Sequence, residues 1–173
     1  RLYREWGYVR FKLNSTIFPG SFITNANITF TSQGDNNLDP GEGLYVFVTD
    51  SGNAPQANTA GARPSFDSGT TTLYPATYTS GVRWPASGML NWPANGVRAT
   101  STNLASLIQH LVDTYGGIAS GQYIAFWIAS TGYASDSNDE VGWYNYEHAT
   151  QLPSSLSRSW TSTPPPQCAE GID

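Results

Sequence analysis

The stretch from Gly7 to Phe30 constrains the fold of this chain more than any other part of the sequence. Two sets of apolar residues alternate there with their neighbours: Val9, Phe11 and Leu13, and then Ala26, Ile28 and Phe30. This period of two is typical of strands that bury one face only. Phe18-Pro19-Gly20 separates the two sets and predicts a turn, because proline fixes φ and glycine accepts a positive φ. The stretch therefore predicts two half-buried strands of a sheet that is packed on one side.

The composition limits the classes of protein to which the chain can belong. Charged residues make up only 12% of the 173 residues, whereas about a quarter is usual in globular proteins. The surface must then be built from Ser, Thr, Asn and Gln, which suits secreted or virion-exposed β proteins. The net charge is −5 and Lys12 is the only lysine, so the sequence has no basic stripe for a nucleic acid. No apolar run approaches the roughly 18 residues of a membrane helix.

One segment has the period of a helix rather than that of a strand. Its apolar residues recur at steps of three and four: Leu104, Leu107, Ile108, Leu111, Val112 and Tyr115. Ser101 or Thr102 supplies an N-cap, and Gly116-Gly117 supplies a C-terminal stop. The pattern predicts one amphipathic helix over about Thr102–Tyr115.

The rest of the chain predicts further strands and one long excursion. Four runs have the composition of strands: Leu44–Thr49, Gln122–Thr131, Val141–His148 and Ser154–Trp160. Gly, Ala, Thr and Pro dominate residues 50–80, which we expect to form a long excursion with one or two short strands. We therefore predict an all-β, jelly-roll β-sandwich with one flanking α-helix over residues 1–160. A Pro-rich extended tail or linker is predicted to follow over residues 161–173.

Three groups of residues occur in the same order as in a known family. Arg10-Phe11, the turn at Phe18–Gly20 and the strand Ile23–Phe30 come first, Trp84, Trp92 and Leu104–Val112 follow, and Pro153 and Leu156 come last. This order resembles the jelly-roll β-sandwich domains of the DNRLRE type, although the chain has no literal DNRLRE string. Those domains occur in phage structural proteins and in secreted bacterial surface or carbohydrate-associated proteins. The resemblance spans most of Tyr8–Trp160 and implies a jelly-roll fold.

The resemblance also bears on the beginning of the domain. Relatives in the family have strand material ahead of the Arg10-Phe11 pair, whereas only Arg1 to Trp6 precede the first strand here. The chain starts without a methionine, so we expect it to be trimmed or excised from a longer protein. A sheet that lacks a strand exposes unpaired N–H and C=O groups. We expect a neighbouring chain to pair with that edge, because the prolines of the Thr161–Asp173 tail cannot donate to a ladder.

Patterns typical of catalysis are weak, and we predict that the protein is not an enzyme. The sequence has no G-x-S-x-G elbow for a nucleophilic serine. His110 lies outside the apolar stripe of the predicted helix and is interpreted as a solvated histidine, while His148 stands at a strand end. Two histidines without an H-E-x-x-H motif do not predict a zinc site. The sequence alone also pairs no two carboxylates for glycosidase chemistry.

Aromatic residues are the other signal, because six tryptophans and ten tyrosines exceed what a core of this size requires. Five of them are candidates for binding a glycan or a protein partner: Trp84, Trp92, Trp127, Trp143 and Tyr144. Ile124, Phe126 and Ile128 take the core face of their strand, so Trp127 points to the opposite face. Exposed rings can stack on sugars or form interface hot spots. The alternative, which we favour for any single tryptophan, is that the ring covers the sandwich.

One turn has the spacing of the start of a calcium loop. Its oxygen-bearing residues stand at or near alternate positions: Asp35, Asn37, Asp39 and Glu42. Pro40 stands where an EF-type loop requires glycine, and a plain hairpin turn is the alternative that we favour. A reserve site would consist of Asp136, Asn138, Asp139 and Glu140. Apart from this structural calcium, the sequence implies no required cofactor.

Two functions remain open after these exclusions. In the first, the domain is a non-catalytic structural or decoration module of a virion or another extracellular assembly, and it acts through surface contacts. In the second, it is a carbohydrate-binding module that stacks a glycan on exposed aromatics. The low charge and the aromatic content favour the first. We expect protein partners in a homo-oligomer or a virion-like assembly, an extracellular or virion-surface location, and polysaccharide as the alternative partner, with no nucleic acid and no membrane span.

Overall fold

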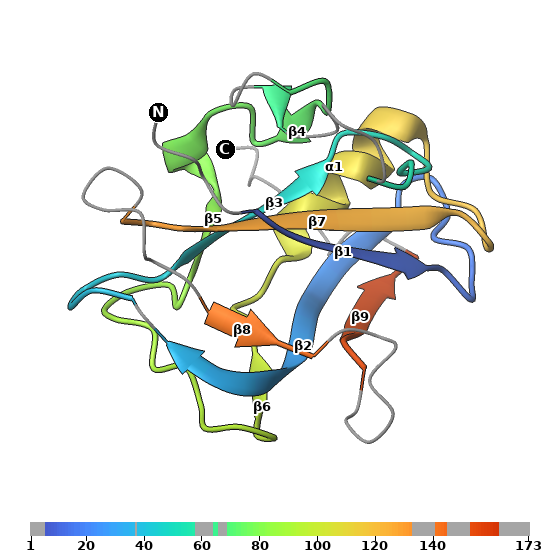
Figure 1. Ribbon diagram of the computed structural model, residues 1–173. Coiled ribbons are helices and arrows are strands. Elements are labelled where there is room, and N and C mark those ends of the chain that lie inside the picture. Colours follow the sequence, from blue (N-terminus) through green and yellow to red (C-terminus); the bar gives the residue numbers. More distant parts are fainter. Residues whose placement is uncertain are drawn as a thin grey trace, which may run out of the picture.

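The computed structural model describes residues 6–36, 38–57, 64–65, 69–132, 141–144 and 153–162. These residues form two antiparallel sheets and one α-helix (Figure 1). The β7 sheet contains β1 (Gly7–Lys12), β3 (Leu44–Thr49), β4 (Leu73–Tyr74), β5 (Val82–Trp84) and β7 (Tyr123–Ser130). The β2 sheet contains β2 (Phe22–Asn36), β6 (Arg98–Thr100), β8 (Val141–Trp143) and β9 (Ser155–Thr161). The predicted all-β sandwich with one helix is confirmed. From residue 163 on, the predicted tail lies outside the described residues.

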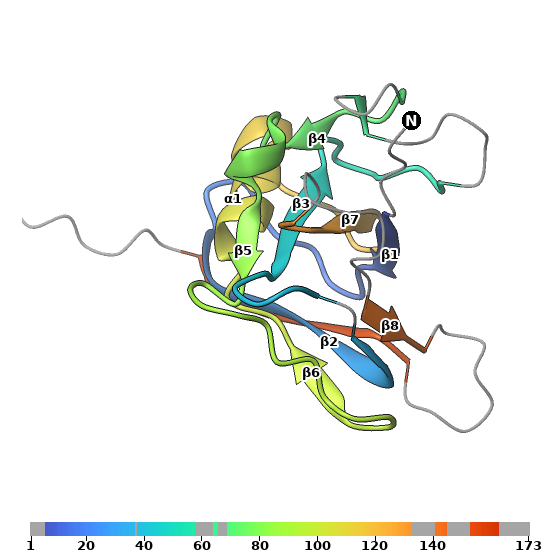
Figure 2. The same ribbon diagram turned by 60° about the vertical axis from the view of Figure 1, so that its left-hand side comes forward.

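The strand order shows how the chain passes between the two sheets. β7 lies between β1 and β3, and β3 also pairs with β4 and β5. β2 pairs with β9 along its first part, with β8 near its end, and with β6. Figure 2 shows the β7 sheet above the β2 sheet, so the successive strands β1, β2 and β3 alternate between the two layers. The predicted turn before β2 is confirmed, because the Ser21 N–H donates to the Phe18 carbonyl at 3.1 Å.

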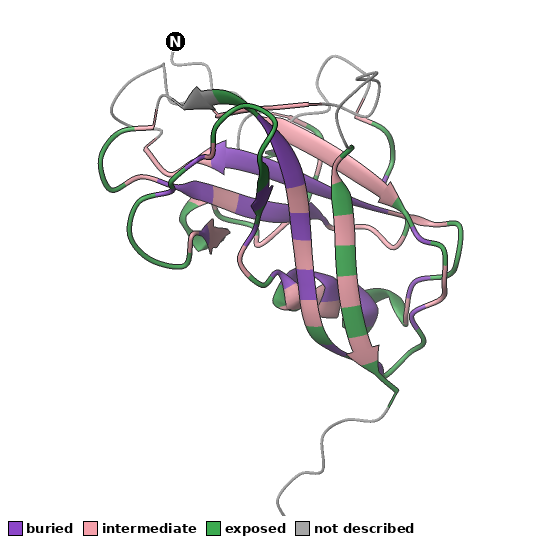
Figure 3. Cartoon of the chain, turned by 90° about the horizontal axis from the view of Figure 1, so that it is seen from below, coloured by how far each residue is buried: buried purple, intermediate pink, exposed green. Residues whose placement is uncertain are grey.

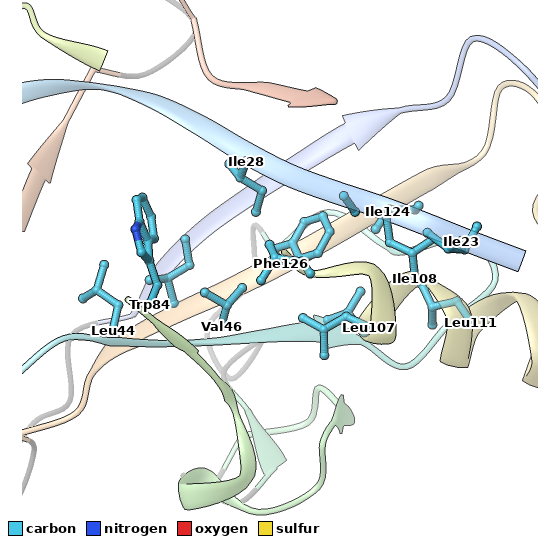
Figure 4. Close-up of a cluster of buried hydrophobic side chains, with 14 of the residues drawn as sticks. Ile23, Ile28, Leu44, Val46, Trp84, Leu107, Ile108, Leu111, Ile124 and Phe126 are labelled. Carbon is cyan, nitrogen blue, oxygen red and sulfur yellow. The ribbon is translucent and has the colours of Figure 1, made fainter. Parts of the chain in front are cut away.

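The main core lies between the sheets, on the faces that the period of two predicted. The inward residues of β2 and β7 are all buried: Ala26, Ile28, Phe30, Ile124, Phe126 and Ile128. Ile28, Phe126 and Leu107 of the helix belong to one continuous cluster (Figure 4). The alternation of the two strands therefore positions both sheets around the same core.

The helix α1 (Ala105–Tyr115) packs its apolar stripe on β2 and β3. Its predicted end is confirmed, because Gly116 has a φ of 69°, in the left-handed region that favours glycine. Its predicted start at Thr102 is wrong, since the helix begins at Ala105. Within the described part of the chain, no helix has the length and apolar character needed to cross a membrane.

The residues ahead of α1 bond to the edge of β2, which explains the later start. The Ser101 Oγ accepts the N–H of Ile28 at 3.0 Å, and the Asn103 Oδ1 accepts the N–H of Ala26 at 3.0 Å. The Leu104 N–H donates to the Ala26 carbonyl at 2.7 Å. Ser101, which the sequence offered as a helix cap, therefore bonds a strand N–H group instead, while the Asn103 Oδ1 accepts both the strand N–H of Ala26 and the N–H of Ala105 at the start of the helix. This part of the β2 edge is satisfied within the chain.

The described parts of the predicted excursion extend the β7 sheet at one edge and cover part of its outer face. They contribute β4 and the short 3₁₀ helix η2 (Tyr78–Ser80). A second hydrophobic cluster forms there around three buried residues: Phe47, Leu73 and Trp127. The partly buried aromatic residues that pack on it are Trp6, Tyr8, Tyr45 and Tyr78. The β7 sheet is consequently packed on both of its faces.

Candidate functional site

Trp84 and Trp92 fill one part of the core between the sheets. The two residues are only 4% and 5% exposed. Trp84 stacks on Phe30 with 6.1 Å between the ring centroids. Trp92 donates its Nε1–H to the Gly142 carbonyl at 3.0 Å. Neither ring is available as an exposed surface for a glycan or a partner, which corrects that prediction.

Trp127 points away from the main core, as the parity of β7 predicted, but it is only 5% exposed. The ring of Tyr8 lies against it with 4.9 Å between centroids, and the ring of Trp6 lies 6.3 Å away. Its Nε1–H donates to the Thr49 Oγ1 at 3.0 Å. The parity gave the correct face, but the prediction of an exposed ring is wrong, because residues distant in sequence cover it.

Trp143 and Tyr144 lie on the other side of the β7 sheet from Trp127. Trp143 is half-buried, and its ring centroid lies 4.7 Å from that of Phe30. A Cβ at Gly7 would lie 2.1 Å from the Trp143 ring, so this close contact requires glycine. The Tyr144 hydroxyl donates to the Asn95 Oδ1 at 2.9 Å. The five predicted aromatic residues therefore do not form one stacking surface.

The candidate calcium loop contains a hydrogen-bonded turn in its described part. The Glu42 N–H donates to the Asp39 carbonyl at 3.0 Å, and the Glu42 Oε2 accepts the Asp39 N–H at 3.1 Å. Asn37 and the side chain of Asp35 lie outside the described residues, as does the whole reserve site: Asp136, Asn138, Asp139 and Glu140. No group of three His, Cys, Asp or Glu that could hold a metal occurs among the residues that are described. The calcium site stays a prediction.

His110 is not the solvated side chain that its helical position predicted. Its ring stacks on Tyr74, with 3.6 Å between centroids and 2° between planes. Its Nε2 lies 3.0 Å from the Asp50 Oδ1. The Tyr115 hydroxyl donates to the Asp50 carbonyl at 2.7 Å and to its Oδ1 at 3.1 Å. Desolvation, the hydrogen bond to Asp50 and the charge of Asp50 raise the pKa of Tyr115. Sequence reasoning missed this cluster, because Asp50 and α1 are distant in the chain.

β1 forms an edge of the β7 sheet, and β7 is its only strand partner among the described residues. The Leu13 N–H continues this ladder and donates to the Gln122 carbonyl at 2.8 Å. Hydrogen-bonding direction alternates along an antiparallel strand. The backbone groups of Tyr8, Arg10 and Lys12 therefore point away from β7. No described residue accepts from or donates to these outward backbone groups.

An apolar groove of about 430 Å³ runs below this free edge, between β1 and the β2 sheet. It is lined by residues 8–12, Trp143, Pro153 and Ser154. Val9, Phe11 and Trp143 are half-buried there and pack against the main core. Figure 2 shows β1 and β8 on the two sides of this open edge of the sandwich. Within the described part of the chain, strand groups without a partner thus lie beside a half-buried apolar surface.

No protein-family model, no curated protein and no solved structure matches this chain. The resemblance to the DNRLRE-type domains accordingly stays a prediction, and the geometry of the chain's own residues has to carry any functional argument.

Proposed function

We propose that the domain is a non-catalytic structural module of a virion or another extracellular assembly, which joins the assembly by accepting an extended strand at the free edge of β1. The observation that carries this proposal is the combination of outward backbone groups on β1 with the apolar groove beneath them. Proteins normally cover such edges, and an added strand is a common mode of recognition.

The added strand would gain energy from two sources. Its backbone would bond to the outward groups of Tyr8, Arg10 and Lys12, at about 0.5–1.5 kcal/mol net for each hydrogen bond. Alternate side chains would enter the groove and cover Val9, Phe11 and Trp143, at roughly 25 cal/mol for each Å² of apolar surface removed from water. The first source is independent of sequence, whereas the second selects strands with apolar residues at every second position.

The charges on β1 indicate which strand fits. Lys12 is exposed, and Arg10 lies beside it on the outer face with its guanidinium 3.5 Å from the Tyr123 ring centroid. Pairing of β1 with a second β1 would bring these cations together, and like charges opposite one another destabilise a sheet. The partner is therefore a different segment of a neighbouring chain, with an acidic residue opposite Lys12. The net charge of −5 makes such segments available within copies of this same chain.

The alternative of a glycan stacked on exposed tryptophans loses its main support, because Trp84, Trp92 and Trp127 are buried. A flat stacking surface requires rings that present a face to solvent. The edge of β1 requires no such exposure, and we therefore prefer strand addition.

Amide exchange at single residues tests the proposal with an internal control. The amides of Tyr8, Arg10 and Lys12 point outward, whereas those of Val9 and Phe11 point to β7. In native assembled material, both sets should exchange slowly. After dissociation to monomers, measured as mass in solution, only the outward set should become fast. Protection of the outward set in a strict monomer, or fast exchange of that set in the assembly, would contradict strand addition.

A pair of variants at Lys12 distinguishes the contribution of the backbone N–H to assembly from that of the side chain. Lys12→Pro removes the outward N–H without touching the ladder to β7, and it should abolish assembly. Lys12→Ala keeps the N–H and should weaken assembly much less. Equal loss in both variants would mean that the side chain, and not the strand edge, makes the contact.

A further inference from the structure

The strand β9 forms an edge of the β2 sheet, and β2 is its only strand partner among the described residues. The backbone groups of Ala26 and Ile28 bond to residues 101–104, on the side of β2 that faces away from β9. Hydrogen-bonding direction alternates along a strand, so the neighbouring residues of β2 bond to β9. The β9 residues opposite these neighbours are Ser155, Ser157 and Ser159.

The residues between and after these serines point their backbone groups away from β2. They are Leu156, Arg158 and Trp160. Within the described part of the chain, nothing bonds to their N–H and C=O groups. By its backbone alone, β9 could therefore accept a further strand just as β1 could. Whether the two edges are equally receptive depends on their side chains.

The side chain of Arg158 lies on the inward face of β9, together with Leu156 and Trp160, which pack against the main core. Its Nη2 donates to the Asn14 Oδ1 at 3.1 Å and to the Ser15 Oγ at 3.2 Å, so it reaches the segment that follows β1. Its Nε is buried and has no hydrogen-bond partner in the described structure. Desolvation by burial lowers the pKa of Arg158. A half-buried cation thus stands at the open edge of β9.

The guanidinium of Arg158 is not a vacant site for a carboxylate. A two-pronged bond to a carboxylate would use Nη2, but Asn14 and Ser15 already accept from it. A strand that paired with β9 would place its own side chains over Arg158 and remove more water from the charge. Because no acidic side chain of the described residues bonds to Arg158, this desolvation would be unfavourable.

Pairing of β9 with the β9 of a second copy would add a repulsion. An antiparallel pairing that matches the outward backbone groups is centred on Ser157, Arg158 or Ser159. In each of these three registers, the two Arg158 side chains lie on the same face of the joined sheet, either opposite one another or diagonal. Like charges at such positions destabilise a sheet.

We propose that Arg158 is a specificity-determining residue that keeps β9 from pairing with a second copy of the chain, and so directs strand addition to β1. An inward-pointing charge is one of the ways in which proteins protect an edge strand. Lys12 does not protect β1 in this way, because its side chain is exposed. The direction to β1 rests on the proposed function, whereas the protection of β9 does not.

The variant Arg158→Leu tests this protection, best in a Lys12→Pro background that is expected not to assemble through β1. Without the charge, the β9 edges of two copies should pair, so the mass in solution should double at micromolar protein concentration. The outward amides of Leu156 and Trp160 should change from fast to slow exchange. The amide of Ser157 faces β2 and should be slow before and after the change, which shows that the fold is intact.

Three further variants control for charge, position and folding. Arg158→Lys keeps a cation at the edge, and its outward β9 amides should stay fast. Arg98→Leu makes the same change at an exposed arginine of β6 and should also leave these amides fast. Arg158→Gln removes the charge but keeps a polar side chain that can bond to Asn14. It should associate more weakly than Arg158→Leu, and it replaces that variant if the leucine impairs folding.

The proposal is overturned if Arg158→Leu and Arg158→Gln both stay monomeric with fast outward amides on β9, or if Arg158→Lys associates as strongly as Arg158→Leu. Slow exchange of the Leu156 and Trp160 amides in the native assembled material would also overturn it, because β9 would then be an edge that accepts a strand. Strand addition at β1 is judged separately. If Lys12→Pro stays assembled while Arg158→Leu slows the outward β9 amides, the proposed function fails and the protection of β9 by Arg158 stands.

Discussion

The outer faces of the two sheets are built on the same alternation, but only one of them is covered. On the β7 sheet, the outward residues are large and aromatic, and Trp6, Tyr78 and Leu73 pack over them. On the β2 sheet, the outward residues are mostly small and polar: Ser155, Ser157 and Ser159 of β9 are exposed, and Asn25, Asn27 and Thr29 of β2 are half-buried (Figure 3). Thr29 and Thr100 bond to each other there, with 3.0 Å between their hydroxyl oxygens.

The difference shows that the size and polarity of the outward residues decide whether a sheet needs a second layer. Each large aromatic side chain buries about 150–250 Å², and removing that area from water stabilises the fold. Ser, Thr and Asn bond to water or to each other and gain little from a cover. The use of uncharged polar residues on this surface also accounts for part of the low charge of the chain. β9, for example, presents Ser155, Ser157 and Ser159 to solvent.

The largest effect is expected from Trp127→Ala, which removes the centre of the covered face. The lost contacts and the remaining cavity should lower the free energy of unfolding by about 3–5 kcal/mol. Denaturant unfolding measures this loss. The matched variant on the bare face, Thr29→Ala, removes one cross-strand pair and should cost at most about 1 kcal/mol. Equal losses in the two variants would show that the outer cluster is not a second core.

A smaller effect is expected at Gly81, where the segment with η2 contacts the outer face of the β7 sheet. A Cβ there would lie 2.6 Å from the Phe47 Cζ and 2.9 Å from the Tyr45 Cβ. The φ of Gly81 is −54°, which alanine adopts without strain. Gly81→Ala should therefore destabilise through overpacking alone, by about 1–3 kcal/mol. Thr79→Ala, in the adjacent exposed turn, should stay within about 0.5 kcal/mol. An unchanged melting temperature in Gly81→Ala would mean that the segment with η2 is not tightly packed on Phe47 and Tyr45.

The same comparison explains which parts of the molecule the sequence could predict. Alternation and helical period are local, so the inward residues of β2 and β7 and the end of α1 at Gly116 were predictable. Parity also placed Trp127 on the outward face. Whether that face is covered depends on Trp6 and on the excursion after β3, which no local pattern links to Trp127.

The candidate sites depend on non-local contacts in the same way. A free edge at β1 was predicted, but nothing in the sequence showed that a groove lined by Trp143 lies beside it. The pairing of Asp50 with His110 was not predictable either, because it depends on how α1 packs against the end of β3. Ser101 had the right chemistry for a helix cap, yet its hydroxyl accepts an N–H of β2, a contact that no local pattern predicts.

The smallest effect is expected from Ser157→Lys on the bare face. Ser157 is exposed and pairs with Asn27 in the β9–β2 ladder, so a long charged side chain can extend into solvent there. The free energy of unfolding should change by less than about 0.5 kcal/mol, and the mass of the assembled material should stay the same. Lys12→Pro, in contrast, should abolish assembly with little effect on the fold. If Ser157→Lys dissociates the assembly while Lys12→Pro does not, the bare polar face is the interface. The two faces would then differ in what covers them, with a segment of the same chain on one and a neighbouring molecule on the other.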